Sequence, residues 1–144
     1  MDPGLARRRL AAARVGRLGT VTEDDRPHLV PCCFALLDAD DAEGRAQPTV
    51  VTAVDAKPKS TLALRRLANV RAHPHASLLV DHYDDGDWSA LWWVRVDGVA
   101  GVVDDGPDRD RAVAALVAKY EQYRRTPPPG PVIALDVTAW RTWP

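Results

Sequence analysis

Residues 49–61, TVVTAVDAKPKST, join a β-branched stretch to a turn with two lysines and then to two hydroxyl residues. β-Branched residues favour extended backbone, so the stretch predicts a strand over residues 49–54. Ser60 and Thr61 suit the start of a helix, because a hydroxyl oxygen accepts a hydrogen bond from a free N–H of the first turn. The segment therefore predicts a strand, a tight turn and a helix over about residues 61–72.

The turn in this segment carries the groups of an anion site. A helix N-terminus presents free N–H groups and the positive end of the helix dipole. Lys57 and Lys59 add two ammonium groups, and Ser60 and Thr61 add hydroxyls. Lysine is scarce in this chain, since Lys119 is the only other one among 19 basic residues. These residues predict a phosphate site, and a solvated turn is the alternative.

Strand and helix patterns extend in both directions from this segment. Five more strands are predicted, at residues 17–22, 28–37, 76–83, 91–103 and 132–137, and two more helices, at residues 5–15 and 107–125. Pro31 predicts an edge position or a bulge in the second strand, because proline cannot donate to a strand ladder. Gly98 or Gly101 predicts a bulge in the fifth strand. Short turns between strands favour a mainly β fold, a six-stranded antiparallel barrel with flanking helices, because closure removes sheet edges.

Composition bounds the class of protein. The 144 residues fit a single domain over residues 1–144, and 46% hydrophobic residues suffice for a core. A net charge of −1 gives no attraction to nucleic acid or to an anionic membrane, and no apolar run nears the ~20 residues of a membrane span. Two adjacent cysteines, Cys32 and Cys33, exclude a disulfide scaffold and a cysteine-built zinc site. We therefore expect a cytoplasmic protein without a metal.

Tryptophan is abundant, with five in the chain and three of them at Trp88, Trp92 and Trp93. Neighbouring strand residues point to opposite faces, so Trp92 and Trp93 cannot both face one core. One ring is expected to pack inside the barrel. The other is expected to meet a flat aromatic ring or a second subunit.

The same segments resemble a known family. Residues 49–88, TVVTAVDAKPKSTLALRRLANVRAHPHASLLVDHYDDGDW, followed by LWWVRVDG at 91–98, look like the pyridoxamine-5'-phosphate-oxidase-like superfamily of FMN-binding split β-barrels. The opening RLGTVTEDDRPHLVPCCF, residues 17–34, fits it too. Within the superfamily the chain is most similar to the branch of F420-dependent, deazaflavin-using oxidoreductases. The order and spacing of the motifs agree over nearly the whole chain.

The resemblance implies a split β-barrel paired as a homodimer, with two cofactor sites at the subunit interface. It implies that coenzyme F420, or FMN, lies along the strand at 49–54 with its phosphate at the turn that follows. The residues implied to line the ring through their backbone are Val51, Thr52, Ala53 and Val54. Those implied to hold the phosphate are Lys57, Lys59, Ser60 and Thr61. Those implied to border the ring are His28, Val30 and Pro31, with Trp92 supplied by the partner subunit.

Departures from the family pattern narrow the activity. The true pyridoxamine-phosphate oxidases carry an arginine-rich C-terminal signature, whereas this tail is only TAWRTWP, residues 138–144. FMN-binding members often have an arginine on the strand at 49–54, and its absence here favours F420. Arg65, Arg66 and the run Arg7–Arg9 are candidates for a rim that meets the acidic tail of F420. Solvated helix faces are the alternative for these arginines.

The expected function is hydride transfer between reduced F420 and an electron-poor double bond of a small organic substrate. The cofactor carries this chemistry, which matches the absence of a catalytic triad or carboxylate pair in the motifs. Solvent, His28 or Tyr83 would donate the proton. An FMN-dependent oxidase or reductase is one alternative, and an F420- or flavin-binding protein without turnover is another.

Overall fold

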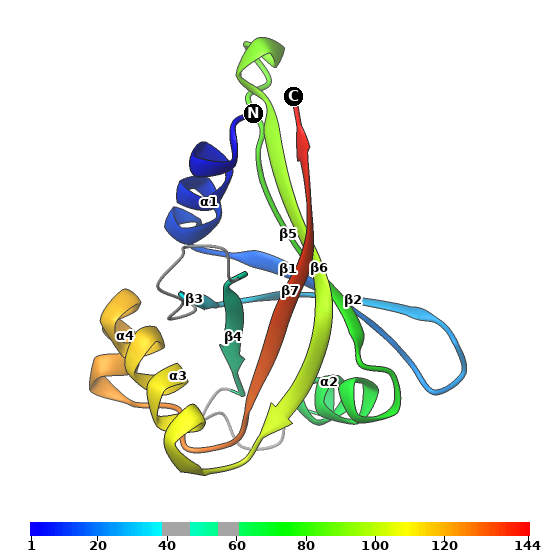
Figure 1. Ribbon diagram of the computed structural model, residues 1–144, viewed down its shortest axis with the longest axis vertical. Coiled ribbons are helices and arrows are strands. Elements are labelled where there is room, and N and C mark those ends of the chain that lie inside the picture. Colours follow the sequence, from blue (N-terminus) through cyan, green and yellow to red (C-terminus); the bar gives the residue numbers. More distant parts are fainter. Residues whose placement is uncertain (39–46, 55–60) are drawn as a thin grey trace.

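Seven strands form one antiparallel sheet, in the order β2-β1-β5-β6-β7-β4-β3, in the computed structural model (Figure 1), which describes residues 1–38, 47–54 and 61–144. For residues 61–64 only the backbone is described. The strands are β1 (Gly16–Val21), β2 (Pro27–Cys32), β3 (Ala35–Leu37), β4 (Thr49–Ala53), β5 (His75–His82), β6 (Trp92–Val103) and β7 (Val132–Trp143). The helices are α1 (Pro3–Ala12), α2 (Thr61–Ala72), α3 (Gly106–Lys119) and α4 (Glu121–Arg125), with a 3-10 turn η1 at Trp88–Ala90.

The sheet closes into a barrel because its two end strands are neighbouring parts of one chain segment. β2 pairs with β1, and β3, which follows β2 directly in the sequence, pairs with β4. The sequence predicted a single strand over residues 28–37, but the structure interrupts it at Cys33 and Phe34, so the barrel has seven strands instead of six. The mainly β, antiparallel fold with flanking helices is confirmed. Pro31 lies on β2, an end strand of the sheet, as predicted.

Side chains from other elements cause this interruption. The Phe34 N–H donates to the Tyr120 hydroxyl at 3.1 Å, and the Phe34 carbonyl oxygen also lies 3.1 Å from that hydroxyl. Thr52 Oγ1 on β4 donates to the Cys33 carbonyl at 2.7 Å. The backbone groups at the break are therefore bonded outside the strand ladder, which satisfies them without continuous pairing.

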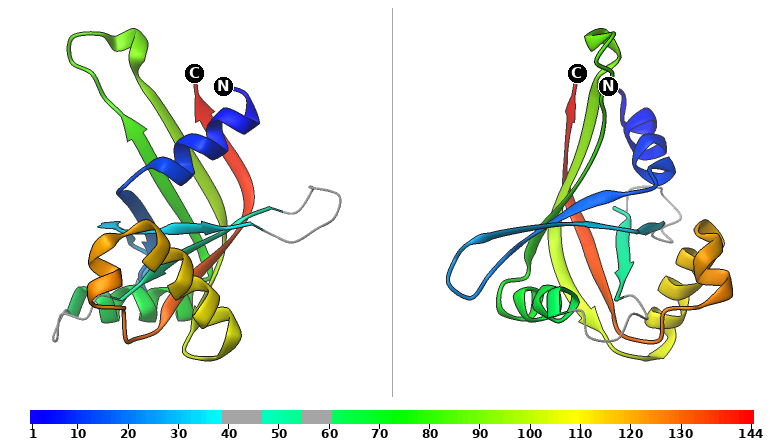
Figure 2. Two further views of the ribbon diagram at one scale, coloured as in Figure 1. Left: turned by 90° about the vertical axis from the view of Figure 1, so that its left-hand side faces the viewer. Right: turned by 180° about the vertical axis from the view of Figure 1, so that it is seen from behind.

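The main hydrophobic core fills the barrel. Fully buried side chains from alternate positions of β5 and β6 form its centre, namely Leu78, Val80, Val94 and Val96. Ala6 and Leu10 of α1 enter this core, and Leu67 and Val70 of α2 do so as well. α1 and α2 lie at opposite ends of the barrel in both views of Figure 2. Each therefore closes one end.

A second, smaller core lies outside the barrel, under α3. Ala112 and Leu116 of α3 pack with Val51, Ala53 and Val132 from the outer faces of β4 and β7. β4 is therefore buried on both faces, which explains its continuous apolar sequence. The described helices cover no such area on β2, β1 and β5, whose outer faces stay uncovered (Figure 2).

Local sequence sets the helix ends. Asp2 Oδ1 accepts a hydrogen bond from the Leu5 N–H at 3.0 Å, and Pro3 occupies the first helical position of α1. The helix ends at Ala12, earlier than the predicted residue 15. The single helix predicted over residues 107–125 is two helices, because Tyr120 adopts extended backbone (φ −116°, ψ 121°) between α3 and α4. None of the helices in the described ranges is long and apolar enough to span a membrane.

The strands β5, β6 and β7 continue beyond the barrel as a twisted arm (Figure 1). β7 runs to Trp143 rather than to the predicted Val137, because its second half pairs with Trp93–Asp97 of β6. The register between β6 and β7 shifts between Asp97 and Gly98, so the irregularity lies where a bulge was predicted, but the extra residue is Thr138 of β7 rather than a residue of β6. A Cβ added to Gly98 would lie 2.0 Å from the Asp136 carbonyl oxygen, so the close approach of β7 requires glycine here.

Candidate functional site

The predicted phosphate segment connects β4 to α2. β4 ends at Ala53 and α2 begins at Thr61, so the strand and helix predicted on either side of the turn are both present. Lys57, Lys59 and Ser60 lie outside the described residues, as does the side chain of Thr61. The described neighbourhood of this turn consists of β4, the α2 face and the inner face of β2.

The four ring-lining residues predicted on β4 divide between its two faces. Val51 and Ala53 point out of the barrel and pack under α3. Thr52 is buried on the other face, and its hydroxyl is bonded to the Cys33 carbonyl. Val54 is half-buried against the main core, and its N–H donates to the Pro131 carbonyl at 3.4 Å. All four side chains are thus engaged in packing, which is consistent with a role through the backbone alone.

The three residues predicted on β2 also divide by strand alternation. His28 and Val30 point toward the inside, half-buried, whereas Pro31 is exposed on the outer face. Val30 packs against the main core. His28 Nδ1 is buried and has no hydrogen-bond partner within the described residues. His28 and Val30 therefore share a face, and Pro31 does not.

α2 turns a polar face toward His28. Asn69 Nδ2 donates to Thr20 Oγ1 at 3.1 Å, both residues being buried, and Thr20 is the cross-strand partner of His28. Arg66 lies one turn before Asn69 on α2 and is half-buried, with Nε buried and without a partner in the described ranges. Arg65 is exposed as predicted, but the prediction that Arg66 points outward is wrong.

The sequence analysis did not identify Thr20 and Asn69. Thr20 lies two residues after the buried Leu18 on β1, so both side chains point inward. Asn69 lies three residues after Arg66 on α2, so these two side chains share a helix face. Polar residues at such positions are the available signal for a polar contact inside the fold.

Cys32 lies between this polar face and Thr52 of β4. Its thiol is buried beside the Thr52 side chain, and burial raises its pKa above the ordinary value, opposed by Thr52 and by the charge of Arg66. A thiol held in its neutral form is a poor nucleophile. Cys32 is therefore part of the wall, and the groups that could act on a ligand are His28 and Arg66, since the Thr52 hydroxyl is already bonded to the Cys33 carbonyl.

Trp92 lies far from this face, at the start of β6 on the arm. Its ring packs partly against the main core, with the Arg9 guanidinium carbon 4.7 Å from the ring centroid. The His82 ring stacks beside it at 6.1 Å between centroids and 20° between planes. The structure therefore does not bring Trp92 to the β2, β4 and α2 neighbourhood of its own chain.

The two groups of arginines predicted for one rim are also apart. Arg65 and Arg66 belong to α2, whereas Arg7, Arg8 and Arg9 belong to α1 at the other end of the barrel (Figure 2). Within one chain the two candidate groups therefore lie at different ends, and they do not line one edge of a single protomer.

The hydrogen-bond donors around the β4–α2 connection suit a ligand that carries both an anionic group and a polar ring. Two lysines and the N-terminus of a twelve-residue helix favour a phosphate by charge and by free N–H groups. The partnerless Arg66 Nε and His28 Nδ1 are buried polar atoms, and such atoms ordinarily have partners. The residues present therefore fit a phosphate-bearing cofactor.

Comparisons with known proteins agree with this architecture. A family model described as pyridoxamine 5'-phosphate oxidase matches residues 4–144. No curated protein matches the sequence.

Several solved structures share the fold at low sequence identity. A conserved hypothetical protein from Mycobacterium tuberculosis has a TM-score of 0.75 at 20% identity, covering 99% of this chain and 84% of that chain. An FAD-binding protein from Mesorhizobium loti has a TM-score of 0.67 at 21% identity, covering 99% and 94%. A heme binding protein from Mycobacterium smegmatis has a TM-score of 0.69 at 23% identity, covering 96% and 52%.

Proposed function

The chain belongs to the pyridoxamine 5'-phosphate oxidase family, and from that premise we propose that it is an F420-dependent oxidoreductase. It transfers a hydride between reduced F420 and a small electron-poor organic substrate. The observation that carries the proposal is the β4–α2 connection, where a lysine-bearing turn lies between a buried strand and a helix N-terminus. This arrangement supplies charge and free N–H groups for the cofactor phosphate.

When bound, F420 supplies the hydride chemistry itself. The chain then has to hold the phosphate, through Lys57, Lys59, Ser60 and the first turn of α2. Arg66 adds a half-buried guanidinium whose Nε has no hydrogen-bond partner among the described residues. His28 is the better-placed proton donor of the two side chains considered, because Tyr83 is exposed on the arm and bonded to Asp85.

FMN is the alternative cofactor, since the family and the FAD-binding structural neighbour use the same fold. The absence of an arginine on β4 favours F420. Binding without turnover is the alternative function. The heme binding protein from Mycobacterium smegmatis has the same fold, so heme is the third ligand to be compared with F420 and FMN.

The uncovered outer face of the barrel supports a homodimer. Leu29, Val99 and Trp143 are among the large apolar residues that are exposed, and strand alternation places all three on the outer side of the sheet, so this face extends from β2, β1 and β5 onto β6 and β7. Leu79 and Trp93 lie between them in the cross-strand register, half-exposed. Exposed apolar area of this kind marks a binding surface. We propose that a second copy covers this face, to which β6 presents Trp93, whereas Trp92 packs inward against its own core.

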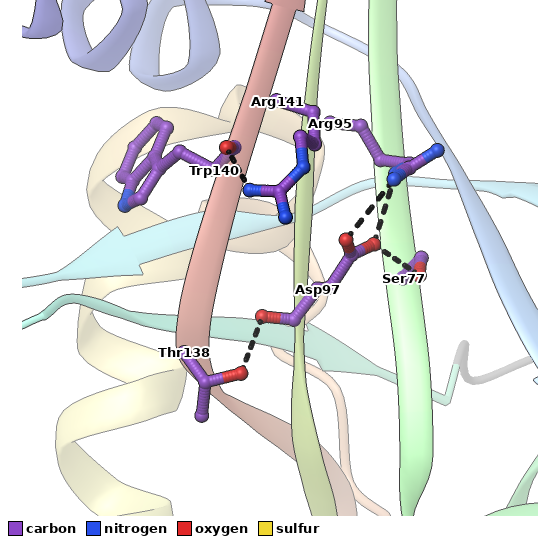
Figure 3. Close-up of polar contacts among 6 residues, drawn as sticks. All are labelled: Ser77, Arg95, Asp97, Thr138, Trp140 and Arg141. Atoms are coloured by element: carbon purple, nitrogen blue, oxygen red, sulfur yellow. Dashed lines mark hydrogen bonds and ion pairs between the residues drawn. The ribbon is translucent and has the colours of Figure 1, made fainter.

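The centre of this face is polar but internally paired (Figure 3). Asp97 accepts a hydrogen bond from Ser77 Oγ at 2.6 Å and from an Arg95 guanidinium nitrogen at 3.2 Å. The Asp97 carbonyl accepts from Thr138 Oγ1 at 3.2 Å. The bonds from Ser77 and Arg95 oppose burial and lower the pKa of Asp97 below its ordinary value. Because the carboxylate already has partners, covering it leaves no unpaired charge.

Fluorescence titration of the purified protein with F420, FMN and hemin, each separately, tests the cofactor. We expect F420 to bind more tightly than FMN or hemin. Oxidation of reduced F420 is then followed with quinones and α,β-unsaturated carbonyl compounds. Binding of F420 without oxidation by any of them would favour the binding-only function. Preference for FMN or hemin would overturn the proposal.

A further inference from the structure

A pocket of about 470 Å³ lies between α1, β3 and α3, and no role proposed above uses it. Its apolar lining consists of Leu36 and four alanines from the three elements. Its charged lining residues are Arg7, Arg8, Lys119 and Asp38. Small-molecule sites commonly have such volumes and combine an apolar body with a few polar groups.

This pocket is separate from the cofactor neighbourhood. Leu36 of β3 pairs with Val50, near the start of β4, whereas the lysine-bearing turn follows Ala53 at its other end. Three strand steps separate Val50 from Ala53, which is roughly 10 Å at about 3.3 Å per residue. The α1 and α3 residues that enclose the pocket belong to neither β2 nor α2.

Lys119 is held in place at the pocket wall. Its Nζ donates to the Ala13 carbonyl at 2.7 Å and lies 4.0 Å from the centroid of the Phe34 ring. Burial and the nearby Arg14 lower its pKa to about 8, against an ordinary 10.5. The ammonium is therefore short of compensating negative charge, and an anion beside it would supply that charge.

The remaining charges at the pocket leave a positive balance. Arg7 is paired with Asp38 across the mouth, from α1 to the end of β3. Asp38 is therefore the one carboxylate among three cationic side chains in the lining. The Arg7–Asp38 pair is neutral as a whole, so Arg8 and Lys119 remain as two uncompensated cations. Two cations beside an apolar lining suit an organic anion better than a neutral ligand.

We propose that the pocket between α1, β3 and α3 is a binding site for small organic carboxylates. Arg8 and Lys119 bind the carboxylate group, and the apolar lining contacts the apolar part of the ligand. The proposal does not depend on the cofactor. Asp38 competes with the ligand for Arg7, so it limits the affinity.

The test is titration of the whole protein with benzoate, followed by backbone amide resonances. We expect the resonances of Ala35, Leu36, Ala115 and Ala118 to shift. Benzyl alcohol, the neutral analogue, and inorganic phosphate, which lacks the apolar body, should each bind at least about tenfold more weakly, because a charged hydrogen bond and apolar burial are each worth more than about 1.4 kcal/mol.

Variants then assign the charges. Arg8→Ala, at an exposed position, should weaken benzoate binding about tenfold, and so should Lys119→Met. Asp38→Asn should strengthen it about threefold by releasing Arg7. Arg125→Ala on α4 removes a matched exposed arginine outside the pocket and should change nothing. Equal binding of benzyl alcohol, unchanged affinity in both Arg8→Ala and Lys119→Met, or shifts confined to other residues would each overturn the proposal.

Discussion

Lys57 and Lys59 carry the phosphate contacts that the proposed function requires. If each donates a charged hydrogen bond, its removal costs roughly 1.5–3 kcal/mol of binding free energy. Lys57→Ala and Lys59→Ala should therefore each raise the dissociation constant for F420 by about tenfold to a hundredfold. Lys57→Arg and Lys59→Arg should keep part of the affinity, because the charge persists with another geometry. Fluorescence titration at one salt concentration measures all four.

Arg125→Ala is the control for these lysines. Arg125 is paired with Glu121 on α4, with both side chains largely exposed, so its loss changes charge without changing the core. Lys119, the remaining lysine, is unsuitable because it is half-buried and bonded to Ala13. Parent-like affinity in both alanine variants would place the phosphate elsewhere.

The lowered pKa of Lys119 should make the free energy of unfolding depend on pH. Its pKa is about 8 in the folded chain and higher when unfolded, so unfolding takes up a proton between about pH 8 and 10.5. The free energy of unfolding should therefore rise with pH in that window, relative to Lys119→Met. Arg14, Cys32, Cys33 and Tyr120 interact with Lys119 and are present in both proteins.

Urea unfolding at pH 7.5 and pH 9.5 measures this difference. The parent should gain stability relative to Lys119→Met over the interval. A gap between the two proteins that stays constant, or that moves the other way, would show that the ammonium is not desolvated in the folded chain.

At the scale of residues, the sequence predicts which side chains share a strand face but not which tertiary contacts they make. Strand alternation is enough to separate His28 and Val30 from Pro31, and residue types mark the lysine turn. The buried position of Arg66 and the Asn69–Thr20 bond depend on how α2 lies against β1, a tertiary relation between segments about fifty residues apart. Periodicity within a helix does not specify that relation.

At the scale of elements, Gly98 in β6 offers a sharp comparison. Gly98→Ala would place a Cβ 2.0 Å from the Asp136 carbonyl, so β7 must move, and we expect a loss of about 2 kcal/mol or more. Gly101→Ala on the same strand meets no atom within 4 Å and should cost little. Thermal and urea unfolding of the two variants give the result. Equal stabilities would mean that the bulge adjusts freely.

The elements themselves were largely predictable, because β-branched runs and helical apolar spacing are local signals. Their ends were less so. The strand over residues 28–37 breaks where Thr52 and Tyr120 bind its backbone, and neither residue is near it in sequence. The long β7 likewise depends on β6 as a partner, since its second half, TAWRTW at 138–143, has neither strict alternation nor a continuous apolar run.

At the scale of the whole molecule, the outer face predicts the oligomeric state. We expect a homodimer by light scattering at micromolar concentration. Val99→Glu should produce a folded monomer, because Val99 is 43% exposed on the uncovered face and a carboxylate there opposes burial. Val15→Glu is the matched control, at 42% exposure in the segment between α1 and β1 rather than on a sheet strand, and should remain dimeric. A monomeric parent, or a dimeric Val99→Glu, would contradict the proposed interface.

β4 is held in the barrel by β7, and their pairing joins Thr49 to Asp136, 87 residues apart. β5 and β6, by contrast, pair across a short connection, with His82 opposite Trp92. Loop-closure entropy makes distant pairings slow to form, so β4 should dock after the rate-limiting step of folding. Val50→Ala in β4 should then mainly speed unfolding, while Val96→Ala in β6, equally buried, should mainly slow folding. Stopped-flow folding and unfolding rates across urea concentrations measure both effects. We expect them to show that the β4–β7 pairing forms last during folding and is lost first during unfolding.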